Sequence, residues 1–221
     1  MVKIETKLPK EKKTKKKGKS KLVVWLVLGI LFIFALAFGY WLFHTVMSPN
    51  VTTPDGKETV IYIPTGSTYE DVQSILSEAN ILLNPKSFNW VAQKKEYPEN
   101  VRPGRYIVKN GMSNNQLVNM LRGGLQNPVK VSFNNIRNVD MLAGRIATQI
   151  EADSASISDL LHNEDYINQL GFNNYTIPAL FLPDTYEFYW NTDAGGFVVR
   201  MFQEYNKFWN EERKKQAQAK G

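Results

Sequence analysis

An uncharged run of 22 residues, Leu22–Phe43, constrains this chain more than any other feature of its sequence. At about 1.5 Å per residue, a helix of this length spans roughly 33 Å, which is enough for the hydrocarbon core of a bilayer. Trp25 lies near its start, and Tyr40 and Trp41 lie near its end, where amphipathic rings favour the headgroup level. The alternative, a buried helix of a soluble domain, fits this length and composition less well. The run predicts a single transmembrane helix over residues 22–43.

The net charge of the chain up to the end of this helix differs from the net charge of the chain after it. Residues 1–43 hold ten lysines and two glutamates, a net charge of +8, so residues 44–221 carry −2 of the chain's +6. Lysines that flank a membrane helix stay on its cytoplasmic side. We therefore expect a cytoplasmic tail at 1–21 and an extracytoplasmic (periplasmic) domain outside the inner (cytoplasmic) membrane. A cleavable signal peptide is the alternative, but it would have a shorter apolar core and a small-residue cleavage site.

The same distribution of charge bears on the class of partner. A nucleic-acid-binding domain concentrates positive charge on its folded part, whereas this chain places it on the tail, so we expect no nucleic-acid partner. The chain has no cysteine and only two histidines, His44 and His162. We therefore expect no thiolate metal site, no histidine-rich metal site, no Ser-His-Asp triad and no cofactor.

The first part of the exported chain predicts a small α+β module. Residues 44–58 contain two prolines and a Pro-Asp-Gly turn and are predicted to be a linker. A capping box of Ser67 and Glu70 is expected to start the first helix. The predicted elements are strand 59–63, helix 68–79, helix 87–94, strand 104–108 and a helix that follows Ser113 and ends at Gly123. This strand-helix-helix-strand order is typical of LysM modules, so residues 59–126 are predicted to be LysM-like.

The second part of the exported chain also mixes strand and helix patterns, so the predicted fold class is α+β throughout. The pattern predicts strand 129–133, helices 140–150, 154–161 and 164–170, and one long amphipathic helix over 194–220. Between the last two helices, residues 177–192 contain two prolines and a single glutamate, Glu187, which four aromatic residues surround. This is the densest stretch outside the membrane segment.

Three blocks in this order resemble the YceG-like, MltG-type endolytic murein transglycosylases over residues 21–221. They are IPTGSTYEDVQSIL, RPGRYIVKNGMSNNQLVNMLRGG and LFLPDTYEFYWNT. The resemblance implies a membrane-anchored enzyme, a lyase that cuts peptidoglycan glycan strands between N-acetylmuramic acid and N-acetylglucosamine and leaves 1,6-anhydro ends. It also implies glycan strands, and the penicillin-binding proteins of the wall-synthesis machinery, as partners.

This chemistry needs only one carboxyl group, which protonates the glycosidic oxygen while the C6 hydroxyl of the sugar attacks. The resemblance implies a catalytic glutamate on a helix some tens of residues after the PDTY block, beyond Gly221. It also implies a glutamate five residues before the proline of that block, where this chain has Pro178. We therefore expect residues 127–221 to be the N-terminal part of a transglycosylase domain and assign no catalytic residue. The rival interpretation is a non-catalytic peptidoglycan-binding or scaffolding protein.

The candidates for substrate binding all lie in the PDTY block. Glu187 could be the acid, a substrate contact or a solvated structural residue, and its aromatic neighbours suit stacking on sugar faces. Asp184 could bind substrate or could be a turn residue whose carboxylate accepts nearby backbone N–H groups. Trp190 could be a glycan platform or a core residue. The full set of predicted substrate-binding residues is Asp184, Tyr186, Glu187, Tyr189 and Trp190.

Overall fold

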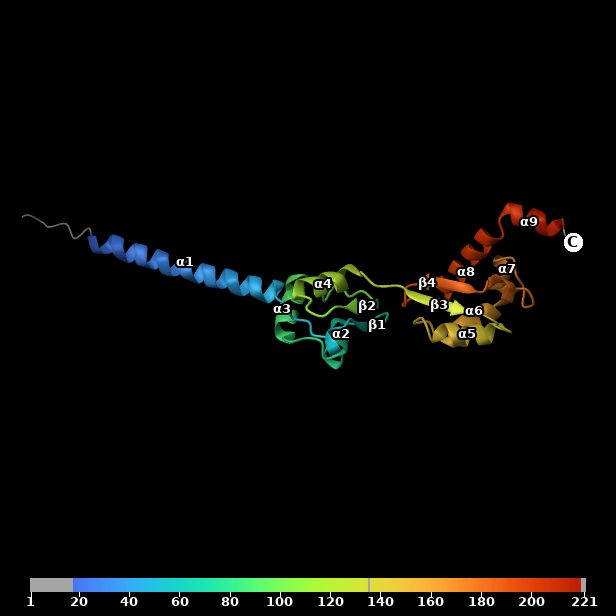
Figure 1. Ribbon diagram of the computed structural model, residues 1–221, viewed down its shortest axis with the longest axis horizontal. Coiled ribbons are helices and arrows are strands. Elements are labelled where there is room, and N and C mark those ends of the chain that lie inside the picture. The colour runs from blue at the N-terminus through green and yellow to red at the C-terminus, as the bar shows by residue number, and fades with distance from the viewer. Residues whose placement is uncertain (1–17, 135, 220–221) are drawn as a thin grey trace, which may run out of the picture. The chain divides into compact units, whose positions relative to one another are not determined.

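The computed structural model describes residues 18–134 and 136–219, and the predicted cytoplasmic tail lies outside these ranges up to residue 17. The first element is one long helix, α1 (Gly18–Met47), drawn in blue in Figure 1. Its part Val23–Met47 is long and apolar enough to cross a membrane, and none of its most apolar window is buried. The predicted apolar helix is therefore confirmed. Residues 46–221 form a compact unit of their own, with a mixed α+β fold.

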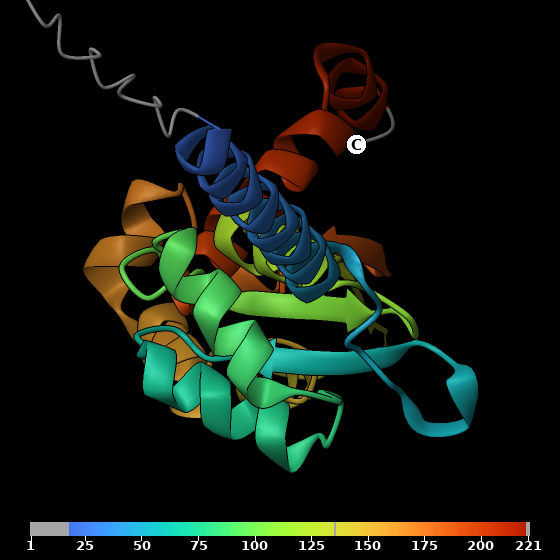
Figure 2. The same ribbon diagram turned by 90° about the vertical axis from the view of Figure 1, so that its left-hand side faces the viewer.

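The first half of this unit contains a two-stranded antiparallel sheet covered by helices (Figure 2). Strands β1 and β2 pair from Thr59 opposite Val108 to Ile63 opposite Gly104. The predicted order of strand, helix, helix, strand and helix is confirmed. The elements are β1 (Thr59–Ile63), α2 (Tyr69–Glu78), α3 (Pro85–Lys94), β2 (Gly104–Val108) and α4 (Asn114–Gly123).

Two helix starts differ from the sequence prediction. The N-cap of α2 is Thr68, whose hydroxyl accepts from the Asp71 N–H (3.2 Å) while the Asp71 carboxylate accepts from the Thr68 N–H (2.8 Å). The predicted Ser67–Glu70 box is therefore wrong by one residue, because Asp has the same capping chemistry as Glu and stands one position later. Helix α3 begins at Pro85, two residues earlier than predicted, because proline suits the first helical turn.

Part of the segment predicted to be a linker packs against the fold. Residues 54–56 form a short 3-10 helix, η1 (Pro54–Gly56). Val51 is buried in the first core, and the Asn50 side chain bonds both the Asn84 backbone and Asn114 Oδ1 (2.7 Å). At the other end of this half, α4 ends at Gly123 as predicted, and Gly124, with a positive φ of 64°, is its C-cap.

The second half of the unit packs its helices around another antiparallel pair of strands, β3 with β4 (Figure 1). The register runs from Val129 opposite Phe188 to Phe133 opposite Asp184. Strand β4 lies within the PDTY block, for which no strand is predicted above. The elements are β3 (Val129–Phe133), α5 (Val139–Ala147), α6 (Ser154–His162), α7 (Glu164–Gln169), η2 (Ile177–Leu180), β4 (Asp184–Phe188), α8 (Ala194–Phe208) and α9 (Glu211–Gln218).

The last predicted helix, 194–220, is two helices. Helix α8 ends at Phe208, and Trp209 after it leaves helical conformation. Asn210 caps α9 by accepting from the Arg213 N–H (2.9 Å). The buried face of α8, with Phe197, Met201 and Val198, joins the second core, whereas no residue of α9 is buried. The helix breaks because the apolar pattern stops there and asparagine offers a new cap.

One strand of each sheet begins at the same local structure, in which a proline is followed three residues later by a tyrosine. The Tyr106 hydroxyl donates to the carbonyl of Arg102 (2.9 Å), and the Tyr186 hydroxyl donates to the carbonyl of Leu182 (2.7 Å). Each bond spans the proline between its two ends. We call these two closures the Pro-x-x-Tyr corners.

Candidate functional site

Two hollows at the end of the β3–β4 sheet share Ser132, Asn134 and Arg145 as lining residues. The first, of about 260 Å³, is also lined by Phe133, Pro183, Asp184 and Thr185. The second, of about 550 Å³, is also lined by Ile136, Met141, Thr148 and Gln149. We call the two together the β3–β4 groove.

Strand pairing assembles the first side of this groove. Ser132 lies opposite Thr185, and Phe133 lies opposite Asp184, so the end of β3 meets the start of β4. The corner made by Tyr186 fixes where β4 begins. Residues far apart in the sequence are thereby placed at one edge of the sheet.

Helix α5 supplies the second side. Gln149, just past its end, holds β3 through both atoms of its amide: Oε1 accepts from the Ser132 N–H (3.0 Å), and Nε2 donates to the Ser132 carbonyl (3.3 Å). Arg145 Nε donates to the same carbonyl (3.3 Å). These bonds fix the guanidinium of Arg145 beside the strand end, where its other N–H groups can serve as donors.

The groove combines one carboxylate with one guanidinium and several hydroxyl and amide groups. Asp184 is the single acid among its lining residues, and it is exposed. Its Oδ1 accepts from the Thr185 N–H (2.7 Å), which fixes the carboxylate and leaves it further acceptor sites. The predicted bond from Asp184 to nearby backbone is thus present, although the residue begins a strand rather than occupying a turn. Such a surface can hydrogen-bond hydroxyl and acetamido groups.

The other predicted site residues lie elsewhere. Tyr186 is 9% exposed and stacks on Phe133 with ring centroids 5.7 Å apart, so its ring belongs to the core. Glu187 is exposed near the far end of β4, opposite Lys130 in the register, and does not line the groove. Of the five candidates, the structure places Asp184 alone among the groove's lining residues.

Tyr189 and Trp190 follow the end of β4. Tyr189 is 56% exposed, whereas Trp190 is half-buried and its ring lies 4.8 Å from that of Tyr62. Next to this contact, the Glu151 carboxylate accepts from both the backbone N–H and the hydroxyl of Thr65, at 2.6 Å each. The ring of Trp190 is therefore partly buried by its contact with Tyr62, which belongs to the other half of residues 46–221.

Pro178, at the position where the family resemblance implies a glutamate, lies near the start of η2 and is half-buried. Its ring supplies no proton, so this position offers no general acid. Pro178 does not line the groove, whose one carboxylate is that of Asp184.

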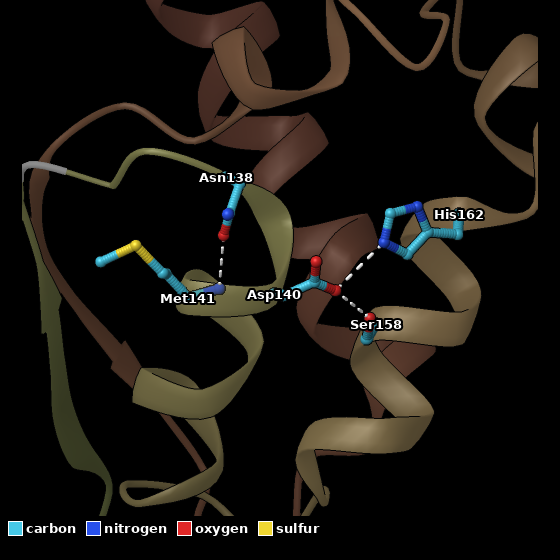
Figure 3. Close-up of polar contacts among 5 residues, drawn as sticks. All are labelled: Asn138, Asp140, Met141, Ser158 and His162. Atoms are coloured by element: carbon cyan, nitrogen blue, oxygen red, sulfur yellow. Dashed lines mark hydrogen bonds and ion pairs between the residues drawn. The ribbon is translucent and has the colours of Figure 1, made fainter.

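A second polar cluster lies between α5 and α6 (Figure 3). Asp140 Oδ1 accepts from the Ser158 hydroxyl (2.5 Å) and lies 3.0 Å from His162 Nε2. These two hydrogen bonds hold the pKa of the Asp140 carboxyl below its usual value, that from Ser158 having the larger effect. Nearby, Asn138 caps α5 by accepting from the Met141 N–H (2.8 Å).

The geometry of this cluster differs from that of a hydrolase triad. In a triad the histidine stands between the nucleophile and the acid, whereas here Asp140 is the shared partner of Ser158 and His162 (Figure 3). The cluster therefore joins two helices rather than activating a serine. Within residues 18–134 and 136–219, no group of three or more His, Cys, Asp and Glu side chains could hold a metal ion.

Arg145, Ser132, Gln149 and Thr185 are groove residues that the sequence patterns did not single out. Arg145 lies in a helix whose amphipathic pattern explains only its apolar face, and Ser132 sits at an exposed position of an alternating strand. Only the pairing of β3 with β4 brings them to Asp184, and a single sequence carries no local signal for that pairing.

Comparison with known proteins gives three findings. The model of the YceG-like family matches residues 61–221. A crystal structure of a YceG-like protein from Listeria monocytogenes is similar at 18% identity with a TM-score of 0.40, over 74% of this chain and 59% of that protein. This chain thus spans less than two thirds of the length of that relative. Curated proteins gave no match. Because the family model covers well over half of the sequence, the chain belongs to the YceG-like family, which is the MltG type.

Proposed function

We propose that this chain is a membrane-anchored endolytic transglycosylase that binds peptidoglycan glycan strands in the β3–β4 groove. The YceG-like family is generally associated with lytic transglycosylases. In this proposal, α1 spans the inner membrane with its N-terminus in the cytoplasm, and residues 46–221 meet the cell wall outside. The reaction breaks the bond between N-acetylmuramic acid and N-acetylglucosamine and leaves a 1,6-anhydro end.

The observation that supports glycan binding is the pairing of an acceptor with a donor across the groove. The Asp184 carboxylate, held by the Thr185 N–H, accepts from sugar hydroxyls, and the Arg145 guanidinium donates to sugar or acetamido oxygens. Hydrogen bonds that involve a charged group contribute about 1.5–3 kcal/mol each. Asp184 thus acts as a substrate contact, and the general acid is left unassigned.

A non-catalytic role is the second candidate, because Pro178 occupies the position of a family glutamate. In that case the groove binds glycan strands without cutting them, and the chain serves as a scaffold for other proteins of wall synthesis, including penicillin-binding proteins. The β1-α2-α3-β2 order supports a LysM-like module as a further glycan contact in either case.

The test uses the full chain in detergent with isolated peptidoglycan sacculi. Sedimentation measures binding, and mass spectrometry of the soluble products counts 1,6-anhydro ends. Asp184→Asn should weaken binding about tenfold, because the amide keeps the shape but loses the charge. Glu187→Gln, further along β4 and outside the lining of the groove, is the matched control and should bind like the unmodified chain.

The outcomes separate the two candidates. Binding together with anhydro ends supports the transglycosylase. Binding without anhydro ends supports the scaffold role for residues 1–221, for which no general acid is assigned. If Asp184→Asn and Glu187→Gln bind equally well, the groove is not the glycan site.

A further inference from the structure

A separate cavity of about 620 Å³ lies between α2 and α3, in the first half of residues 46–221. Its lining comes from α2, from the start of α3 and from the loop that joins them, so it shares no residue with the β3–β4 groove. Small-molecule sites usually have volumes of about 300–1,000 Å³ and an apolar lining with a few placed polar groups. The cavity has the size of such a site.

The lining of this cavity contains apolar and polar parts. Leu76 and Phe88, both with no exposed surface, belong to the first core and also line the cavity. Leu82 and Pro85 add further apolar surface. Leu76 and Phe88 have no water-exposed surface to lose, so a ligand with a short aliphatic segment removes apolar surface of Leu82 and Pro85 from water when it binds.

Two amide side chains in the lining are already oriented by the protein. Asn89 Oδ1 accepts from Gln73 Nε2 (2.7 Å) and from the Tyr69 hydroxyl (3.0 Å). Two donors on one oxygen fix which end of the Asn89 amide is the donor. Asn89 Nδ2 and Gln73 Oε1 have no partner among the residues that the structure describes. Together they offer one donor and one acceptor, which is the complement of a peptide group.

The charge of the cavity has one sign. Glu70 and Glu78 belong to its lining, and no lysine or arginine does. The cavity therefore attracts a cation and repels a carboxylate or phosphate. We propose that the α2–α3 cavity binds a short peptide segment that carries a free ammonium group on an aliphatic side chain.

Each part of such a ligand has a complement in the cavity. The ammonium group pairs with a glutamate of the lining, the aliphatic stem covers the apolar lining, and the peptide group pairs with Asn89 and Gln73. The site goes beyond the proposed glycan binding and does not depend on it, because the two sites share no residue.

The experiment measures binding of N-acetyl-Ala-Lys-Ala-amide, labelled for fluorescence anisotropy, to the full chain in detergent at low salt. The matched probe has norleucine in place of lysine, which keeps the aliphatic stem and removes the charge. We expect the lysine peptide to bind, with a Kd below about 1 mM, and the norleucine peptide to bind at least about fivefold more weakly.

Variants locate the site. Glu70→Gln and Glu78→Gln should each weaken binding of the lysine peptide about three- to fivefold, because each removes one charge at a partly solvated surface. Glu99→Gln removes an exposed charge of the same module outside the cavity and should leave binding unchanged. Asp184→Asn should also leave peptide binding unchanged, although it weakens glycan binding.

Three results would overturn the proposal: equal binding of the two peptides, no binding at about 1 mM peptide, or the same loss with Glu99→Gln as with Glu70→Gln and Glu78→Gln. Thermal melts of all variants accompany the titrations. Glutamine keeps the length and helix propensity of glutamate at these α2 positions, so unchanged melts are expected.

Discussion

Two tyrosines of the PDTY block stand three residues apart and have different surroundings. The Tyr186 hydroxyl closes a Pro-x-x-Tyr corner on the Leu182 carbonyl, whereas Tyr189 is mostly exposed and its hydroxyl has no partner among the described residues. Tyr186→Phe should lower the free energy of unfolding by about 1 kcal/mol, because it removes the hydrogen bond and leaves the Leu182 carbonyl without that donor. Tyr189→Phe should change it by less than about 0.5 kcal/mol.

Denaturant unfolding of the full chain in detergent, followed by tryptophan fluorescence, checks this difference. Burial raises the pKa of the Tyr186 hydroxyl, so it stays protonated and able to donate at every ordinary pH. An equal effect of the two substitutions would mean that the Tyr186 bond contributes nothing to stability.

Asp140 predicts a dependence of stability on pH. Its hydrogen bonds with Ser158 and His162 lower the pKa of the folded carboxyl, so the stability they give is complete above the unfolded pKa near 3.8. That stability is lost as the pH falls through the lower, folded pKa. Melting temperatures between about pH 6 and pH 2.5 should therefore fall more steeply for the unmodified chain than for Asp140→Asn.

The control for this prediction is Asp159→Asn, on α6. The carboxylate of Asp159 makes no hydrogen bond or ion pair with another described residue, so this variant should keep the steep acid dependence. Parallel melting curves for Asp140→Asn and the unmodified chain would show that the cluster in Figure 3 does not contribute to acid stability.

At the scale of whole elements, the start of α2 gives a test of the corrected cap. Thr68→Ala should destabilise the protein by about 1 kcal/mol, since the hydroxyl accepts one of the free N–H groups of the first turn. Ser67→Ala, one residue earlier, should be close to neutral. Denaturant midpoints of the two variants decide between the caps, and a larger loss for Ser67→Ala would restore the box first predicted from the sequence.

The elements that sequence patterns predicted correctly have strong local signals. Strands 59–63, 104–108 and 129–133 consist largely of β-branched and aromatic residues. Ser113 caps the start of α4 with its side chain, and Gly124 caps its end with a left-handed backbone, and both residue types are visible in the local sequence. The break between α8 and α9 was missed because charged residues after Trp209 continue to favour helix.

Strand β4 and the groove depend on pairing that no local window contains. Asp184 follows a proline and Glu187 is exposed, so the segment shows only a weak alternation, and its strand state comes from β3. For the same reason, the sequence could indicate Asp184 as a candidate but could not place Arg145 and Ser132 beside it. The site is a product of tertiary contacts rather than of a motif.

At the scale of the whole molecule, the anchor predicts a topology. The helix α1 follows a lysine-rich tail, and charge bias of that kind keeps the tail in the cytoplasm. A C-terminal fusion of alkaline phosphatase, which is active only outside the cytoplasm, should therefore be active. A fusion to a reporter that works only in the cytoplasm should be silent. The reverse pattern would contradict the extracytoplasmic placement of residues 46–221.

The two Pro-x-x-Tyr corners also have a consequence for the order in which the chain folds. Each closes a segment of only four residues, so its loop-closure entropy is small and it can form within the unfolded chain. Pairing β3 with β4 must instead bring Phe133 to Asp184 across four intervening helical segments, and contacts of such long range slow folding. We therefore expect the start of β4 to form early, before β3 has paired with it. In that state the edge of β4 is unpaired, and the PDTY block of this chain is most exposed to aggregation.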